Sequence, residues 1–127
     1  MSNMSSALCK SLLDHLFGVA AYTPAVTIYA SLHTADPGDT GANETAYTDY
    51  TRVAVAFDAA VNKVIQQANT QYNFPQAGAT GGAATHYGLW TAQSGGVFLG
   101  GGGLNNGITI NPGGVPKLLA GEIVVSY

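Results

Sequence analysis

Three histidines are the residues of this sequence best suited to bind a metal or to transfer protons. His15, His33 and His86 form no HExxH motif, and none is paired with the single cysteine, Cys9, at the spacing of a zinc site. An isolated histidine is far more often packed or displayed on a surface than used as a ligand or base. The histidines therefore predict no catalytic or metal site.

Three carboxylates share the loop sequence TADPGDTGANET: Asp36, Asp39 and Glu44. A calcium-binding loop needs regularly spaced oxygen ligands, as in DxDxDG, and this loop lacks that spacing. Asp and Asn side chains also bond to their own backbone in turns, which Pro37 and Gly38 indicate here. We expect these carboxylates to shape the loop rather than to bind a metal.

The motifs of nucleophilic catalysis and of phosphate binding are missing from the sequence. It contains no GxSxG, the turn that exposes a catalytic serine. The glycine-rich stretch GGGGLNNG has neither the lysine of a phosphate-binding loop nor a predicted helix after it. We therefore expect a protein that is not an enzyme and that uses no catalytic residues, metal or cofactor.

The low charge is the most unusual feature of the composition. Only 9% of the residues are charged, against about 25% in an ordinary soluble domain. A surface with so few charges tends to associate, so the composition predicts a protein covered by neighbours in an assembly. The net charge of −3, without a basic cluster, argues against a nucleic-acid partner. No apolar run approaches the roughly 20 residues of a membrane span, which argues against a membrane partner.

The length of 127 residues fits a single domain at 1–127, and its segment 5–18 predicts an amphipathic helix. Five apolar residues recur there at helical spacing: Leu8, Leu12, Leu13, Leu16 and Phe17. Ser5 or Ser6 is placed to cap the start, and Gly18 to end the helix in a left-handed conformation. Because an exposed leucine stripe promotes aggregation, we expect this face and Cys9 to pack against the sheet, although a partner could also cover them.

From residue 24 onward, short segments of alternating polarity predict strands separated by glycine- and proline-rich turns. The expected strands are VTIYASLH, YTRVAVAF, TQYNFP, ATHYGLWTA, VFLGG, GITIN and GEIVVSY. Residues 59–68 fit either a helical turn or loop and strand, and we favour loop and strand. The pattern predicts a mainly β fold over 24–127, a small antiparallel β-sandwich or barrel-like domain.

The glycine run at 100–103 has two interpretations of equal weight. It marks either a bulge and hairpin corner or a place where the backbone of a neighbouring chain comes close. Asparagines and tyrosines on loops would suit a receptor-binding surface, whereas tyrosines more often pack in the core. The candidate interface residues are Gly100, Gly101, Gly102, Gly103, Asn105, Asn106, Tyr47 and Tyr50.

Five segments follow one another in an order that resembles a known family. They are KSLLDHLFGVAAYTPAVTIYASLHTADPGDTG at 10–41, YTRVAVAF at 50–57, NTQYNFP at 69–75, THYGLWTA at 85–92 and AGEIVVSY at 120–127. They resemble small virion proteins of tailed bacteriophages, which are labelled as tail fibre proteins or as capsid decoration (cement) proteins. The resemblance covers nearly the whole chain and implies a structural protein of the virion.

Two positions in the virion fit this resemblance. A cement protein would lie on the capsid surface as a homotrimer and bridge copies of the major capsid protein. The low charge fits that role, because covered surface need not be solvated, and we take it as the first expectation. The alternative is a small tail or tail-fibre component, a tip or adaptor that contacts a host surface.

Overall fold

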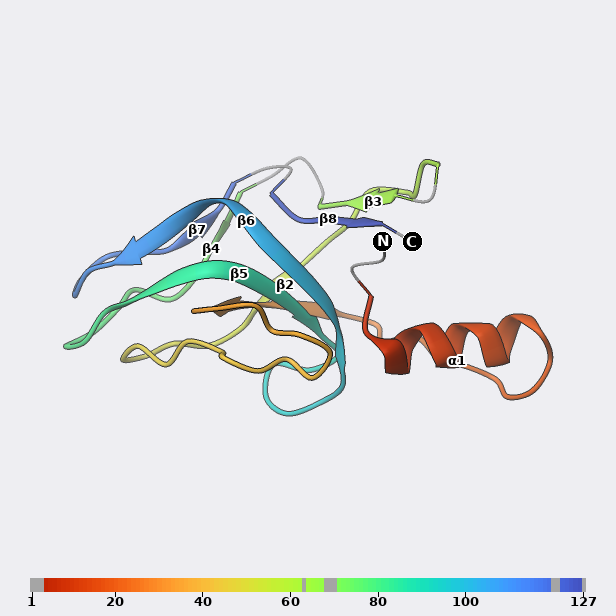
Figure 1. Cartoon of the computed structure of the whole chain (residues 1–127). Helices are drawn as coiled ribbons and strands as arrows, with labels where there is room; N and C mark the ends of the chain where they lie inside the picture. Colours follow the sequence, from red (N-terminus) through yellow and green to blue (C-terminus); the bar gives the residue numbers. More distant parts are fainter. Residues whose placement is uncertain (1–3, 63, 68–70, 120–121, 127) are drawn as a thin grey trace.

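The computed structural model describes residues 4–62, 64–67, 71–119 and 122–126. Parts of the predicted segments at 59–68, 69–75 and 120–127 lie outside these residues. The described elements are α1 (Ser6–Leu16), β1 (Ile28–His33), β2 (Val53–Val55), β3 (Val64–Gln66), β4 (Tyr72–Asn73), β5 (Gly82–Trp90), β6 (Phe98–Ile110), β7 (Lys117–Leu118) and β8 (Val124–Ser126). The expected class is confirmed: the fold is mainly β with antiparallel strands and one short N-terminal helix (Figure 1).

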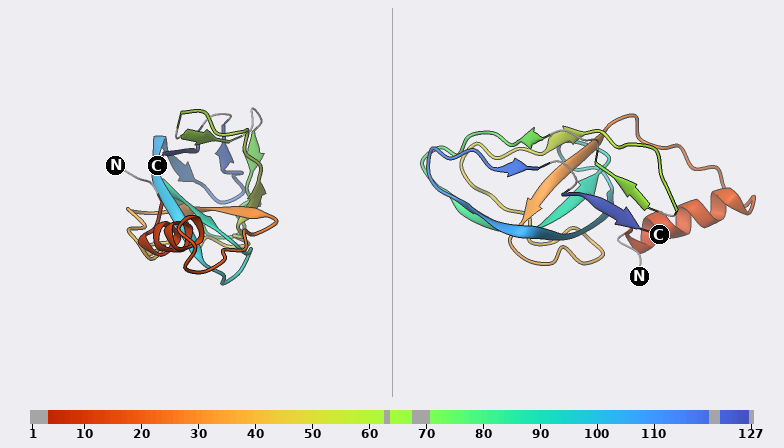
Figure 2. Two further views of the ribbon diagram at one scale, coloured as in Figure 1. Left: turned by 90° about the vertical axis from the view of Figure 1, so that its right-hand side faces the viewer. Right: turned by 90° about the horizontal axis from the view of Figure 1, so that it is seen from above.

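A four-stranded sheet in the order β2-β1-β5-β6 carries most of the pairing, and two short ladders, β3-β8 and β4-β7, complete the β region. Figure 2 shows the sheet and the ladders arranged around a common interior. Sheet residues such as Leu32 and Tyr87 meet Phe74, Leu118 and Ile123 from the ladder side in this core. This layering is consistent with the predicted sandwich. In the described part of the chain, no helix has the length and apolar character needed to cross a membrane.

Strand β1 is buried on both of its faces in its second half. Ala30 and Leu32 lie in the core, as the alternating pattern predicts. Ser31 and His33, on the opposite face, are buried as well because the loop that follows the strand folds back over them: the amide of Thr45 donates to the carbonyl of Leu32. The strand also begins later than predicted. The sheet separates the main core, on the Ala30 and Leu32 face, from a smaller group of buried residues that includes Ser31 and His33.

The glycine run lies inside a strand and not at a corner. The two strands predicted as VFLGG and GITIN are one strand, β6, which pairs with β5 from Trp90↔Phe98 to Gly82↔Ile110. Residues 104–107 bulge opposite Thr85, and the glycines at 100–103 precede this bulge. The first interpretation of the glycine run is therefore half right. The run is not at a hairpin corner, but a bulge does follow it in the strand.

The close approach at Gly101 is made by the chain's own backbone. A Cβ atom at this position would collide with the carbonyl oxygen of Tyr87 and would lie 3.0 Å from Cγ of Pro37. Gly103 is different, because the nearest atoms to its Cβ position are those of the His86 ring at 3.9 Å. Within the described chain, a side chain is sterically excluded at Gly101 and tolerated at Gly103.

Helix α1 is capped as predicted at both ends. The Ser5 hydroxyl accepts a hydrogen bond from the amide of Leu8 at 3.1 Å. At the other end, Gly18 has φ of +78°, and Val19 donates its amide to the carbonyl of Asp14. These contacts satisfy amides and carbonyls that a helix leaves unpaired at its ends. The local sequence therefore determines where α1 begins and ends.

The prediction that the apolar face of α1 packs against the sheet is wrong. The helix extends away from the β region (Figure 1), and none of its residues is buried. Leu16 and Phe17 are 73% and 77% exposed, and Cys9 is only partly buried. The amide of Ser5 donates to the carbonyl of Leu99 at 2.7 Å, so the start of the helix is attached to β6. Leu8 and Leu12 are therefore partly buried, whereas the far end of the leucine-rich face is left exposed by the described chain.

Candidate functional site

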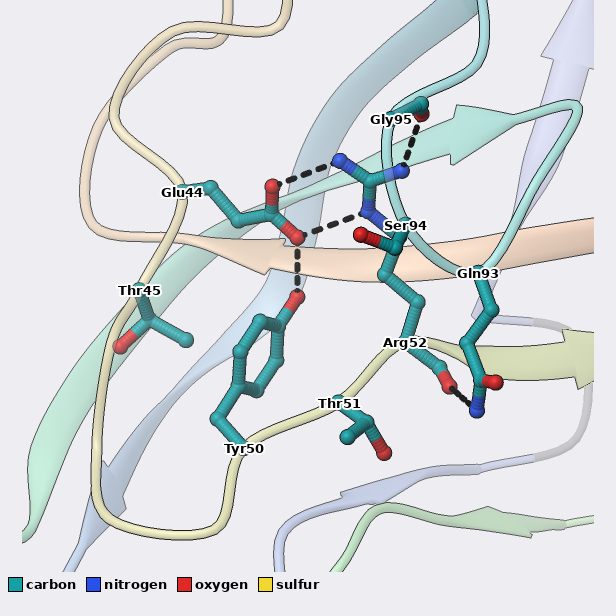
Figure 3. A pocket seen from close by; sticks show the side chains of 8 residues that line it. All are labelled: Glu44, Thr45, Tyr50, Thr51, Arg52, Gln93, Ser94 and Gly95. Atoms are coloured by element: carbon teal, nitrogen blue, oxygen red, sulfur yellow. Dashed lines mark hydrogen bonds and ion pairs between the residues drawn. The ribbon is translucent and has the colours of Figure 1, made fainter.

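A polar cleft of about 500 Å³ opens between the chain that precedes β2 and the turn that follows β5 (Figure 3). The first wall consists of residues 44–45 and 50–52, and the second consists of residues 93–95. Both walls are loops held by neighbouring strands, which is a common way to position polar side chains at a site. The lining residues are Glu44, Thr45, Tyr50, Thr51, Arg52, Gln93, Ser94 and Gly95.

Arg52 joins the two walls of the cleft. Its Nε and Nη2 donate to the two carboxylate oxygens of Glu44 at 3.0 and 2.9 Å. Its Nη1 donates to the carbonyls of Ala92 and Gly95 at 3.0 and 2.8 Å. The guanidinium also lies 3.7 Å from the ring centroid of Trp90, and the residue is 8% exposed. Such a bidentate, stacked arginine is a rigid link between loops.

Tyr50 completes the network beneath the cleft. Its hydroxyl donates to Oε2 of Glu44 at 2.6 Å and accepts from the amide of Leu32 at 3.2 Å. Burial opposes ionisation of Glu44, but the hydrogen bonds from Arg52 and Tyr50 outweigh burial, so the pKa of Glu44 is lowered. Burial and the Glu44 carboxylate raise the pKa of Tyr50. At neutral pH the site therefore holds one carboxylate, one guanidinium and a neutral phenol.

The rim of the cleft carries polar groups that are not used inside the protein. Within the described residues, the hydroxyls of Thr51 and Ser94 make no hydrogen bond, and Figure 3 shows the Ser94 hydroxyl turned toward the space beside Glu44. The amide nitrogen of Gln93 donates to the carbonyl of Arg52 at 3.3 Å. The rim thus offers two hydroxyls and the carboxamide oxygen of Gln93 above a neutralised ion pair.

The structure separates the residues of the predicted interface. Of the two tyrosines, Tyr50 lines the cleft, whereas Tyr47 is 3% exposed and donates to the carbonyl of Pro75. Burial raises the pKa of Tyr47 to about 12. Tyr47 therefore fits the core interpretation. Asn105 and Asn106 are exposed on the β6 bulge, and the glycines at 100–103 precede them. Contact of any of these residues with a partner stays a prediction.

Sequence reasoning missed most of the cleft. Glu44 is predicted only to shape its loop, and it does so through its ion pair with Arg52. The sequence does not predict Arg52, Gln93 or Ser94 as site residues. One signal was present, because Arg52 is one of only four basic residues and precedes an apolar strand. Asp36 shapes the loop as expected, because it accepts from the amide of Gly38 at 2.8 Å. Asp39 instead accepts from the amide of Ser6 at 2.7 Å, at the start of α1.

A buried histidine connects β1 to the loop above it. Nδ1 of His33 donates to the carbonyl of Ala42 at 2.7 Å, and Nε2 lies 2.7 Å from the Ser31 hydroxyl. Trp90 donates its indole NH to the same hydroxyl at 2.8 Å. Burial is the main cause that lowers the pKa of His33, so the folded protein holds this ring neutral.

Stability is expected to fall as the pH drops below about 6.5, the ordinary histidine pKa. The unfolded chain then binds a proton that the folded chain resists, at a cost of up to about 1.4 kcal/mol per pH unit. The hydrogen bond to the Ala42 carbonyl and the nearby Glu44 carboxylate oppose this lowering of the pKa. Arg52 and His86 add to it. Denaturant unfolding between pH 5 and 8 measures the slope.

The slope should disappear in His33→Gln and persist in His15→Gln, because His15 is exposed on the helix. A slope that survives in His33→Gln would show that another group causes the acid sensitivity. The comparison uses the change in unfolding free energy with pH within each variant, so a lower absolute stability of His33→Gln does not affect the outcome.

The comparisons with known proteins bear on the whole chain. A search of curated proteins gave no significant match. Residues 3–126 match the family described as Podophage GP4 fiber I protein gp80. This confirms the resemblance to virion proteins of tailed phages that the sequence motifs carry. The chain therefore belongs to the family of the podophage GP4 fiber I protein gp80, a family of structural proteins of the virion.

Proposed function

We propose that this protein is a structural component of a phage tail fibre. The family match carries the proposal, because it spans residues 3–126 and the description of the family names a fibre. The low charge made a capsid cement protein the first expectation, but covered surface is equally required of a fibre subunit. The family description therefore favours the tail component, which was the alternative.

The exposed face of α1 supports a role in an assembly. Leu13 and Leu16 on this helix and Phe17 at its C-cap are 45%, 73% and 77% exposed. Contact with neighbouring virion chains would remove this apolar surface from water, at a gain of about 25 cal/mol per Å² before association costs. We include copies of this chain among those neighbours and propose a homotrimer as the unit.

The number of copies per virion is expected to be a multiple of three between a few and a few dozen. Quantitative mass spectrometry of purified particles measures it, with the major capsid protein of the same particles as the internal reference. Gold-labelled antibodies should decorate the tail in electron micrographs. A copy number comparable to that of the major capsid protein would instead support the cement role. Absence from the particle would reject both roles.

A further inference from the structure

We propose that the polar cleft binds a neutral sugar, held by hydrogen bonds with the Thr51 and Ser94 hydroxyls and the Gln93 carboxamide oxygen at its rim. Its volume of about 500 Å³ falls within the roughly 300–1,000 Å³ of small-molecule sites. The cleft lies between two walls that Arg52 holds together, so it is present before any ligand arrives. A site of this kind loses little conformational entropy on binding.

The electrostatics of the cleft exclude ionic ligands. Phosphate recognition needs cationic donors that are free to bind, and the Arg52 guanidinium is 8% exposed and bonded to a carboxylate and two carbonyls. The Glu44 carboxylate is neutralised in turn by Arg52 and accepts a further bond from Tyr50. A bound cation would have to displace these donors. The cleft therefore favours an uncharged ligand.

The groups that remain available match the hydroxyls of a sugar. Each sugar hydroxyl both donates and accepts, and so do the hydroxyls of Thr51 and Ser94. The carboxamide oxygen of Gln93 accepts, while its nitrogen already donates to the Arg52 carbonyl. Ser94 and Thr51 come from opposite walls of the cleft (Figure 3), so each wall contributes one hydroxyl to its rim.

The floor of the cleft is fixed by aromatic packing. The Tyr50 ring stacks on Phe74 with an interplanar angle of 11° and meets Tyr47 edge-on at 5.3 Å between centroids. Trp90, the only tryptophan of the chain, lies under Arg52. Its fluorescence therefore reports on events in the cleft. We assign the sugar to the surface of the host cell, and this assignment rests on the proposed function. Binding of a sugar in the cleft does not depend on it.

Saturation-transfer NMR with glucose, galactose, mannose and N-acetylglucosamine, each alone with the full-length protein, tests the proposal. We expect transfer from at least one sugar, together with a change in Trp90 emission. Ser94→Leu and Thr51→Leu fill the cleft from its two walls and should weaken this binding by about tenfold or more. Thr27→Leu places the same residue at an exposed position outside the cleft and should leave binding unchanged.

Near-ultraviolet circular dichroism confirms that each variant retains the wild-type packing. The proposal is overturned by an absence of transfer from all four sugars, by binding that survives both Ser94→Leu and Thr51→Leu, or by inorganic phosphate that changes Trp90 emission where the sugars do not. Each result is independent of the copy number in the virion, so failure of sugar binding is distinguishable from failure of the fibre assignment.

Discussion

Arg52→Met is expected to lower the free energy of unfolding by about 3 kcal/mol, the lower end of the cost of breaking a buried ion pair. The substitution leaves Glu44 without its partner and leaves the carbonyls of Ala92 and Gly95 without their donor. It also removes the cation that lies 3.7 Å from the Trp90 ring centroid. The Glu44 side chain is 24% exposed, so water recovers part of the loss. Denaturant unfolding at pH 7 measures the difference.

Two comparisons make this prediction specific. Lys117→Met removes an exposed cation and should change stability by less than about 0.5 kcal/mol. Glu44→Gln combined with Arg52→Met should cost less than the sum of the single changes, because the unpaired carboxylate is gone. A loss below about 1 kcal/mol in Arg52→Met would mean that the pair behaves like a surface ion pair.

Gly101→Ala is expected to lower the free energy of unfolding by about 2–3 kcal/mol, the upper part of the range for overpacked sites. The new methyl group would collide with the Tyr87 carbonyl, which belongs to the strand paired with β6. Backbone cannot move aside as a flexible side chain can, and Pro37 blocks the site at 3.0 Å. The β5–β6 ladder must therefore open locally, and thermal unfolding of the isolated protein records the loss.

Gly103→Ala is the matched control, since it lies in the same strand and its Cβ position makes only ordinary contacts, at 3.9 Å from the His86 ring. It should be neutral or slightly stabilising, because alanine restricts the unfolded chain more than glycine does. If Gly101→Ala keeps the wild-type stability and the virions lack the protein, Gly101 serves a contact between chains, which is the other interpretation of the glycine run.

The sequence predicts the parts of the fold that local chemistry determines. The caps of α1 at Ser5 and Gly18 and the strands around Ile28–His33 and Gly82–Trp90 follow from short-range patterns. The continuity of β6 does not, because a glycine run looks the same in a turn and inside a strand. What decides between them is the approach of Tyr87 and Pro37, which are distant in sequence.

Short-range sequence patterns cannot predict the cleft or the packing of α1, for related reasons. Arg52 meets Glu44, Ala92 and Gly95 only because loops far apart in the chain converge, and no spacing rule encodes that convergence. The leucines of α1 show that one face of the helix needs cover. Periodicity cannot distinguish cover by the same chain from cover by another, and the structure leaves the second half of that face exposed.

The one-ended attachment of α1 also determines how mechanical tension would enter the β region. A pull on the helix reaches the sheet through Met4 and Ser5, which pair with the start of β6, and through the connection that leads into β1. Strand β1 lies between β2 and β5, so both of its edges are bonded. A load along β1 is therefore shared by two ladders in shear, and bonds in both must break together before the strand slides.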